Sequence, residues 1–439
     1  MHLSPHRGFR DPVLYLHRRK LDLRRDPTMN IVLVTDFAHI NGGASKVALG
    51  SARALAVRGH RVVVLAGVGP VDASLTNVEN LSVECLGQHD LLGNPNRLSA
   101  AVKGIWNWEA SARIKAILNE LPLEDTVVHV HMWGKALTSS VVRAAAEMGF
   151  PIILTLHDFL AACPTGTLFH HGTQSICTLD PMSLRCIASD CDARNYGHKL
   201  WRVSRQLAQL GPGKLPSAIG DFIAISSKCK AVMEQHLPAG ARLHLVENPV
   251  DVQRAARVDV AANTHFVFVG RLAAEKGAVL FAQAAKTANV PALFIGEGEK
   301  RDAILQVNPD AVVTGWKSGD EALQLLRTAR ALIFPSLWQE TQGLVVAEAL
   351  AMGIPAIVAD SSAATDWVID GHNGLWFRSG DTDDLSAKIC YLREQPEEAA
   401  RMGHRAYDSY WAEPATVKRH IFALESLYSA VCSPTGAMA

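Results

Sequence analysis

Short runs of Val, Ile and Leu recur from Asn30 onward, and stretches long enough for a helix separate them. We predict strands at residues 31–34, 62–65, 81–83, 127–130, 152–155, 222–225, 243–246, 266–269, 292–295, 311–313, 331–334 and 354–358. Nearly continuous apolar strands that alternate with helices are typical of parallel sheets covered by helices on both faces. The strands fall into two series of similar length, which predicts two doubly wound α/β domains.

A turn-like stretch at Glu247–Asp251 separates the two series. We therefore expect a first domain at residues 29–247 and a second at residues 248–411. Apolar positions recur at helical spacing within residues 412–439, which predicts an amphipathic C-terminal helix that could pack on either domain. Because parallel strands deliver their loops to one edge of a sheet, a ligand site is expected in the cleft between the domains.

Composition and charge exclude several classes of protein. Lys and Arg together number 43, and Asp and Glu together also number 43, so basic and acidic residues balance. A dedicated nucleic-acid-binding protein would show an excess of basic residues. No apolar run reaches the roughly 18 residues of a membrane span, and the first residues lack the apolar segment of a secretory signal. We therefore expect a cytoplasmic protein. Residues 1–28 are basic, and we expect either a disordered extension or an arm that contacts anionic lipid at the inner face of the membrane.

The segment from Pro335 to Leu350 carries the strongest chemical signal. It runs from an apolar strand through a loop into a helix that we expect to begin near Gly343. A helix N-terminus presents free N–H groups and the positive end of a dipole, which favours a phosphate or diphosphate. Glu340 and Glu348 flank this anion site and could accept hydrogen bonds from sugar hydroxyls. Alone, the segment is equally compatible with a surface helix that carries one solvated and one capping glutamate.

Three other loops follow predicted strands. Arg271 and Lys276 lie on one of them and could both reach an anion in the cleft. Gly42 and Gly43 open a helix after the first strand, but their spacing is not the GxGxxG fingerprint of dinucleotide binding. His157 ends a further strand, where it would face the cleft. Each of these signals is weak alone, because basic loops are often merely solvated and single histidines often lie in the core.

Taken in this order, the loops resemble the family 4 retaining glycosyltransferases of GT-B fold. The residues that carry the resemblance are Gly42-Gly43, Thr155-Leu-His157, Gly270-Arg271 with Lys276, Glu340 and Glu348 with Gly343-Leu-Val-Val between them, and the segment from Asp370 to Asp381. The resemblance covers about residues 29–410 and is more specific in the second half. It departs at Gln342, where an aromatic residue is common, and at Asn248-Pro249, where Asn-Gly is more usual.

The resemblance implies two Rossmann-like domains that face each other across a cleft, and it implies roles for these residues. His157 and Glu340 would act at the transferred sugar. The residues that would bind the nucleotide-sugar donor are Gly42, Gly43, Arg271, Lys276, Glu297, Trp316, Gly343, Leu344, Val345 and Glu348. Transfer would retain the anomeric configuration. No carboxylate cluster for a divalent metal is evident, so we expect a metal-independent reaction with no cofactor beyond the nucleotide-sugar.

Residues 160–200 form a long, irregular insertion, which its position predicts to be a lid on the acceptor side. Its cysteines, Cys163, Cys177, Cys186 and Cys191, could hold a structural zinc as thiolates. Their spacings include no CxxC, so cysteines that simply pack in the interior are the alternative. The basic and aromatic stretch at residues 198–205 is either a solvated helix face or a rim that contacts a lipid-diphosphate acceptor at the membrane surface.

We therefore expect a hexosyltransferase that acts on a saccharide or lipid-linked acceptor, at most in peripheral contact with a membrane, in bacterial surface polysaccharide synthesis. Two alternatives stay open. A nucleotide-sugar epimerase or hydrolase of the same fold would convert the donor without any acceptor. A catalytically silent scaffold would bind the donor and leave it unchanged. A hydride-transferring Rossmann enzyme is disfavoured because its glycine fingerprint is missing.

Overall fold

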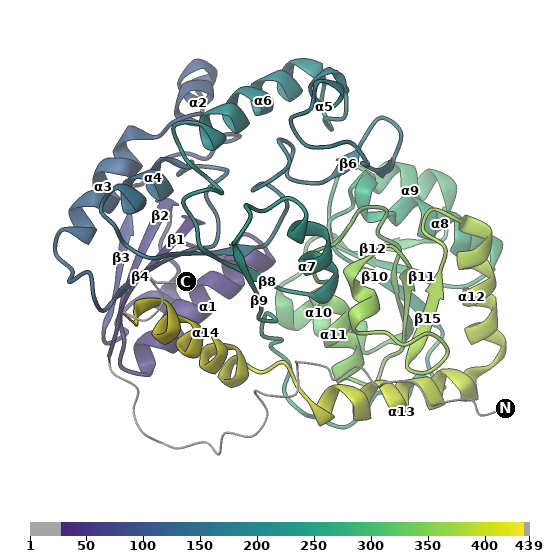
Figure 1. Ribbon diagram of the computed structural model, residues 1–439. Coiled ribbons are helices and arrows are strands. Elements are labelled where there is room, and N and C mark those ends of the chain that lie inside the picture. The colour runs from purple at the N-terminus through teal and green to yellow at the C-terminus, as the bar shows by residue number, and fades with distance from the viewer. Residues whose placement is uncertain (1–27, 434–439) are drawn as a thin grey trace, which may run out of the picture.

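Two parallel sheets, each flanked by helices, make up the computed structural model, which describes residues 28–433 (Figure 1). The first sheet has the order β3-β2-β1-β4-β5-β8-β9. Its strands are β1 Asn30–Phe37, β2 Arg61–Val68, β3 Leu81–Cys85, β4 Thr126–Val130, β5 Ile152–Leu156, β8 Asp221–Ala224 and β9 Arg242–Leu245. The second has the order β12-β11-β10-β13-β14-β15. Its strands are β10 His265–Val269, β11 Ala292–Ile295, β12 Val312–Val313, β13 Ala329–Phe334, β14 Ala356–Ala359 and β15 Gly374–Phe377. The expected pair of doubly wound domains is confirmed.

Helices connect the strands and cover the sheets. Those of the first half are α1 Gly43–Val57, α2 Arg97–Lys103, α3 Trp108–Leu118, α4 Ser140–Glu147, α5 Leu184–Ala188, α6 Tyr196–Leu210 and α7 Ser227–Glu234. Those of the second half are α8 Ala278–Thr287, α9 Arg301–Val307, α10 Gly319–Leu326, α11 Leu344–Ala351, α12 Thr382–Glu394, α13 Pro396–Ala412 and α14 Val417–Cys432. Short 3-10 helices lie at Ala73–Leu75, Ala274–Lys276 and Ala363–Asp366. The helices expected after Gly42 and near Gly343 therefore begin where the sequence placed them.

Each of the twelve predicted strands overlaps an observed one, and three observed strands were not predicted. β15 is only four residues long and follows a turn-rich segment, which gave it no clear apolar run. The insertion at residues 160–200 contains the small antiparallel hairpin β6 Phe169–His170 and β7 Ser175–Ile176. Two-residue strands carry no periodicity that a sequence can reveal.

The C-terminal helix α14 packs on the first domain, although the preceding helix α13 belongs to the core of the second. Ile421, Leu424 and Tyr428 are buried with residues of α1 and β1, and Figure 1 shows α14 beside α1. Glu425 accepts hydrogen bonds from Arg58 and His60 at the C-terminal end of α1. Fully burying an apolar side chain contributes about 1.5–3 kcal/mol, so this contact holds α14 firmly on the first domain.

The chain passes from the first domain to the second between Val246 and Val250, since Val246 packs in the core of the first domain and Val250 in the core of the second. No helix within residues 28–433 is long and apolar enough to cross a membrane. The basic stretch at residues 1–28, for which we expect either a disordered extension or a lipid-contacting arm, lies outside the described residues except for residue 28.

Candidate active site

The N-terminus of α11 lies beyond the end of a buried strand. β13 is buried along its whole length and leads into the loop before Gly343. Gly343 caps the helix with φ +83°, and a Cβ there would lie 3.2 Å from the Phe334 ring, so a larger residue would strain the turn. No side chain caps this N-terminus and no acid lies in its first turn. The positive end of the dipole, at Leu344 and Val345, is therefore not offset by a side chain of the helix itself, and donor binding there stays a prediction.

Glu340 and Lys276 form a largely buried ion pair directly before this helix. The Lys276 ammonium lies 2.5 Å from Oε1 of Glu340, which also accepts a hydrogen bond of 2.6 Å from the Ser336 hydroxyl. Burial opposes ionisation of Glu340, but the Lys276 charge and the hydrogen bonds from Lys276 and Ser336 outweigh it and hold its pKa below the ordinary value. Glu340 is therefore a carboxylate that can accept further hydrogen bonds.

A glycine fixes the position of Lys276. Gly277 has φ +68°, and a Cβ there would lie 1.9 Å from the carbonyl oxygen of Pro335. The loop after β10 thereby lies directly against the loop after β13. Arg271 lies on the same loop and pairs with Glu275 at 2.5 Å, but its side chain is mostly exposed. The Glu275 carboxylate is buried, whereas the Arg271 guanidinium keeps an exposed face that a bound anion could contact.

Glu348, in the second turn of α11, lines a cavity of about 220 Å³. Val345, Val269 and the Lys46–Asp251 ion pair, 3.3 Å long, also line it. Burial raises the pKa of Glu348 to about 7, and Lys46 only partly offsets this effect. Sequence reasoning missed Lys46 and Asp251, although Lys46 lies one turn into the helix that Gly43 opens.

Two loops of the first domain meet this group across the cleft. A Cβ on Gly43 would lie 3.7 Å from Cδ1 of Leu344, so the N-termini of α1 and α11 approach each other. α1 also begins without a side-chain cap, at Gly42. The backbone carbonyl of His157 accepts a hydrogen bond of 3.0 Å from the Thr341 hydroxyl, beside Glu340. The structure thus brings together loops that are as far apart in sequence as Gly43 and Leu344.

His157 belongs to a cluster of histidines at the ends of β4 and β5. Its Nε2 lies 2.9 Å from Nδ1 of His131, whose ring packs on that of His129. His129 is held at 2.6 Å by the hydroxyl of Tyr428 from α14. Burial lowers the pKa of both His157 and His129 to about 3, so these rings are neutral near neutral pH. Nothing in the local sequence pointed to Tyr428 as a neighbour of this cluster.

Glu297 and the turn at Gly315-Trp316 lie together but outside the cavity that Glu348 lines. Gly315 pairs with Gly296, and a Cβ on Gly315 would lie 3.3 Å from Oε1 of Glu297. The Trp316 side chain is exposed. Neither Glu297 nor Trp316 is among the residues that line the 220 Å³ cavity. Their expected role in binding the nucleotide-sugar donor stays a prediction.

Two of the four cysteines of the insertion contact a buried lysine. Lys199 is fully buried, and its ammonium donates hydrogen bonds to Cys191 at 3.1 Å and Cys186 at 3.6 Å. Cys163 instead contacts the Thr165 hydroxyl, and Cys177 is only partly buried. Within the described part of the chain, no three His, Cys, Asp or Glu side chains are grouped so as to hold a metal ion. The geometry gives the zinc hypothesis no support, and it stays a prediction for metal analysis.

Two family models match adjoining parts of the chain. Residues 41–254 match the model described as Glycosyltransferase Family 4, and residues 253–409 match the model described as Glycosyl transferases group 1. Sulfoquinovosyl transferase SQD2 of Arabidopsis thaliana is 30% identical over 161 residues, which are 35% of this chain and 31% of that protein. A glycogen synthase of Mycobacterium tuberculosis is 23% identical over 397 residues, which are 84% of this chain and 88% of that protein.

Solved structures share the fold over most of the chain. Sucrose-phosphate synthase from Thermosynechococcus elongatus superimposes with a TM-score of 0.67 at 15% identity, over 92% of this chain and 99% of that one. HepE of Anabaena, solved in complex with UDP and glucose, superimposes with a TM-score of 0.61 at 17% identity, over 91% of this chain and 100% of that one. At these identities the likeness shows the two-domain fold.

Proposed function

Because this chain belongs to the family 4 glycosyltransferases of GT-B fold, we propose that it moves a hexosyl unit from a nucleotide diphosphate-sugar to an acceptor on the first domain. The observation that carries this proposal is the approach of two helix N-termini without side-chain caps, α1 and α11, next to the Lys276–Glu340 pair. Helix dipoles and an ammonium suit a diphosphate, and the carboxylates of Glu340 and Glu348 suit sugar hydroxyls. The complex of HepE with UDP and glucose supports a donor of this class.

Charge at the leaving group drives the proposed reaction. Breaking the anomeric C–O bond leaves a diphosphate with new negative charge and an oxocarbenium-like carbon. Lys276, Arg271 and the N-terminus of α11 would stabilise that negative charge at fixed positions. These groups supply the positive charge that a divalent metal would otherwise bring, which supports metal-independent transfer.

His157 and Glu340 would act at the sugar. Glu340 is ionised and would hold the sugar hydroxyls as an acceptor of hydrogen bonds. A neutral His157 would offer a hydrogen bond without placing a positive charge beside the oxocarbenium-like carbon. Attack from the face of the leaving group would retain the anomeric configuration. Closure of the cleft would exclude water and so limit hydrolysis of the donor.

We extend the proposal to a saccharide or lipid-linked acceptor in the synthesis of a bacterial surface polysaccharide, by a protein that works in the cytoplasm. The rival functions are an epimerase or hydrolase, which would convert the donor alone, and a silent scaffold, which would convert nothing. The Lys276–Glu340 pair, with Glu348 and Arg271 nearby, is a complete set of charged groups for the donor and argues against the scaffold.

Thermal unfolding with UDP, GDP, ADP, dTDP and their common sugars tests the donor site. A ligand at about 100 times its Kd adds roughly 2.7 kcal/mol to the free energy of unfolding, so one nucleotide should stand out. Products from the responding sugar, with and without acceptor and with added EDTA, would then separate transfer from hydrolysis and test metal independence. If the folded protein responds to none of these ligands, the proposal is wrong.

A further inference from the structure

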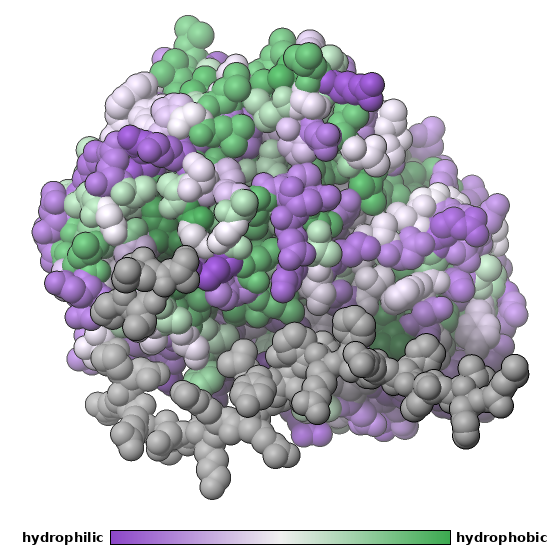
Figure 2. All heavy atoms as spheres, viewed as in Figure 1, coloured by the Kyte–Doolittle hydropathy of each residue, from purple (hydrophilic) through white to green (hydrophobic). Residues whose placement is uncertain are grey.

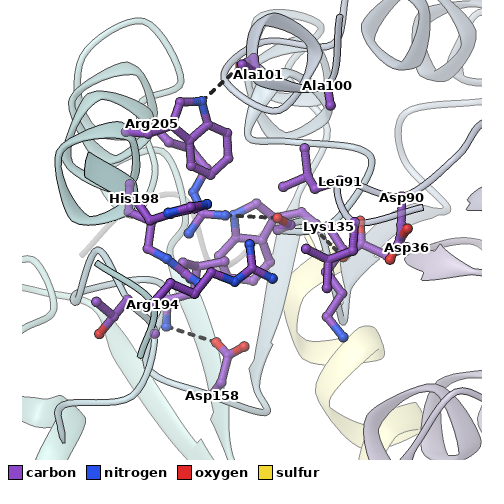
Figure 3. A pocket seen from close by; sticks show the side chains of 18 of the residues that line it. Asp36, Asp90, Leu91, Ala100, Ala101, Lys135, Asp158, Arg194, His198 and Arg205 are labelled. Atoms are coloured by element: carbon purple, nitrogen blue, oxygen red, sulfur yellow. Dashed lines mark hydrogen bonds between the residues drawn. The ribbon is translucent and has the colours of Figure 1, made fainter. Parts of the chain in front are cut away.

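A cavity of about 560 Å³ opens in the first domain beside the histidine cluster. The ends of β4 and β5, the loop after β3, and helices α2 and α6 surround it (Figure 3). His131 lines this cavity and is hydrogen-bonded to His157 at 2.9 Å, so the cavity adjoins the proposed reaction centre. It is separate from the smaller cavity that Glu348 lines, because the two have no lining residue in common.

Buried polar atoms in this cavity lack partners. Arg205 is 7% exposed and donates hydrogen bonds to the carbonyls of Gly134 and Pro164, but its Nε has no hydrogen-bond partner among the described residues. Nε2 of His131, which is 2% exposed, also has none. Buried polar atoms are nearly always hydrogen-bonded in folded proteins, so two such atoms in one cavity point to a polar ligand.

The charge around the cavity favours an anion. Lys135 and Arg194 line it, and within residues 28–433 neither forms a salt bridge with a carboxylate. The carboxylates of Asp36, Asp90 and Asp158 also line it, but each already accepts hydrogen bonds from backbone N–H groups, which are those of residues 135–137, of Gly93 and of Leu160 respectively. Figure 3 shows Arg194, His198 and Arg205 on one side of the cavity and Lys135 on the other. Lysine and arginine side chains without carboxylate partners are typical of phosphate sites.

One wall of the cavity is apolar and continues onto the surface. Trp201 on α6 donates a hydrogen bond of 3.1 Å to Ala101 on α2, which joins the two helices above the cavity. Leu92 lines the cavity and is itself exposed. Farther out on α2, Leu98 and Val102 are 82% and 56% exposed, and on α6 Leu207 is also exposed. Figure 2 shows apolar side chains gathered at the top of the molecule, where Figure 1 places α2 and α6.

We propose that this cavity binds the phosphate-bearing end of a lipid-linked acceptor, and that the α2–α6 surface, formed by Leu92, Leu98, Val102, Leu200 and Leu207, docks on an anionic bilayer. This inference rests on the proposed function, because it names the acceptor class. Exposed apolar side chains near Arg97 and Arg194, which line the cavity, suit a negatively charged lipid surface. A soluble sugar phosphate would fill the basic part of the cavity but would leave Leu98 and Val102 without a function.

Flotation of the full chain with vesicles tests the docking surface. We expect binding to vesicles that contain phosphatidylglycerol and little binding to phosphatidylcholine alone. The double variant Leu98→Ser, Val102→Ser should lose about tenfold or more of this binding, because two apolar side chains no longer enter the lipid. Val57→Ser, on the exposed end of α1, is the matched control and should bind as the wild type does. Equal binding by the double variant, or no binding by the wild type, overturns the docking surface.

Tryptophan fluorescence with dodecyl phosphate tests the cavity, with glucose 1-phosphate as the soluble probe. Dodecyl phosphate should bind the wild type, and Lys135→Ala with Arg194→Ala should weaken it about tenfold, as expected for the loss of two charge-assisted contacts. Lys286→Ala on α8 is the matched control. Tight binding of glucose 1-phosphate alone would overturn the lipid-linked class. Nucleotide binding is measured on the same samples. If nucleotide binding is absent, the proposed donor site is wrong. If nucleotides bind but dodecyl phosphate does not, only the proposed acceptor cavity is wrong.

Discussion

Replacing Lys276 with methionine would leave Glu340 buried without its counter-ion. Methionine keeps an unbranched apolar stem, and the hydrogen bond from Ser336 to Glu340 stays in place. The change therefore removes one charge at 2.5 Å from a carboxylate that is only 7% exposed. Removing one partner of a buried ion pair costs about 3–5 kcal/mol. Because the Lys276 side chain is itself 22% exposed, we expect the lower end, about 3 kcal/mol at pH 8.

The loss should depend on pH with a definite sign. In the wild type the pKa of Glu340 lies below 4.5, so the stability it contributes is present above that value and is lost as the pH falls. In the variant burial acts without the Lys276 charge, so the pKa of Glu340 rises above 4.5. The variant then loses stability as the pH rises. The difference between the two proteins should therefore be small near pH 5 and large near pH 8.

Urea unfolding of the wild type, Lys276→Met, Glu340→Gln and the double variant at several pH values measures this coupling. We expect the double variant to be more stable than Lys276→Met at pH 8, because the buried charge is gone. Nucleotide titration on the same proteins should show weaker donor binding in Lys276→Met. An equal loss of stability at pH 5 and pH 8, or a double variant no more stable than the single one, would refute this account of the ion pair.

Three other results are expected. Burial raises the pKa of Glu348 to about 7, so donor affinity measured by calorimetry should increase from pH 6 to pH 8, and Glu348→Gln should weaken it about tenfold and remove most of that dependence. Burial lowers the pKa of His129 and His157 to about 3, so below pH 6.5 the unfolded protein binds protons at these residues more readily than the folded protein does. The Tm should therefore fall as the pH drops from 7 to 5, and an unchanged Tm would contradict their burial. Gly277→Ala would place a Cβ 1.9 Å from the Pro335 carbonyl oxygen, so we expect a lower Tm and weaker nucleotide binding together.

Local patterns in the sequence were enough to predict the strands of the candidate site and the residues at which its helices begin. The apolar run of β13, the glycine at 343 and the helical pattern after it predicted a strand, a loop and a helix N-terminus, because each depends on neighbouring residues. The alternation of strands and helices likewise predicted two parallel sheets. The resemblance then brought the separate loops to one site, which no single motif could do.

Only the tertiary structure decided which side chains contact one another. Lys276 and Glu340 are 64 residues apart, and His129 and Tyr428 are 299 apart. Both contacts depend on how whole strands and helices pack. The same holds for α14, whose apolar face fitted either domain until its packing against α1 was known. The pKa of Glu348 is likewise set by burial, which depends on every element around a side chain. The sequence by itself determined which segments form strands, helices and loops, because backbone preference and apolar periodicity are local, and packing determined which of their side chains meet.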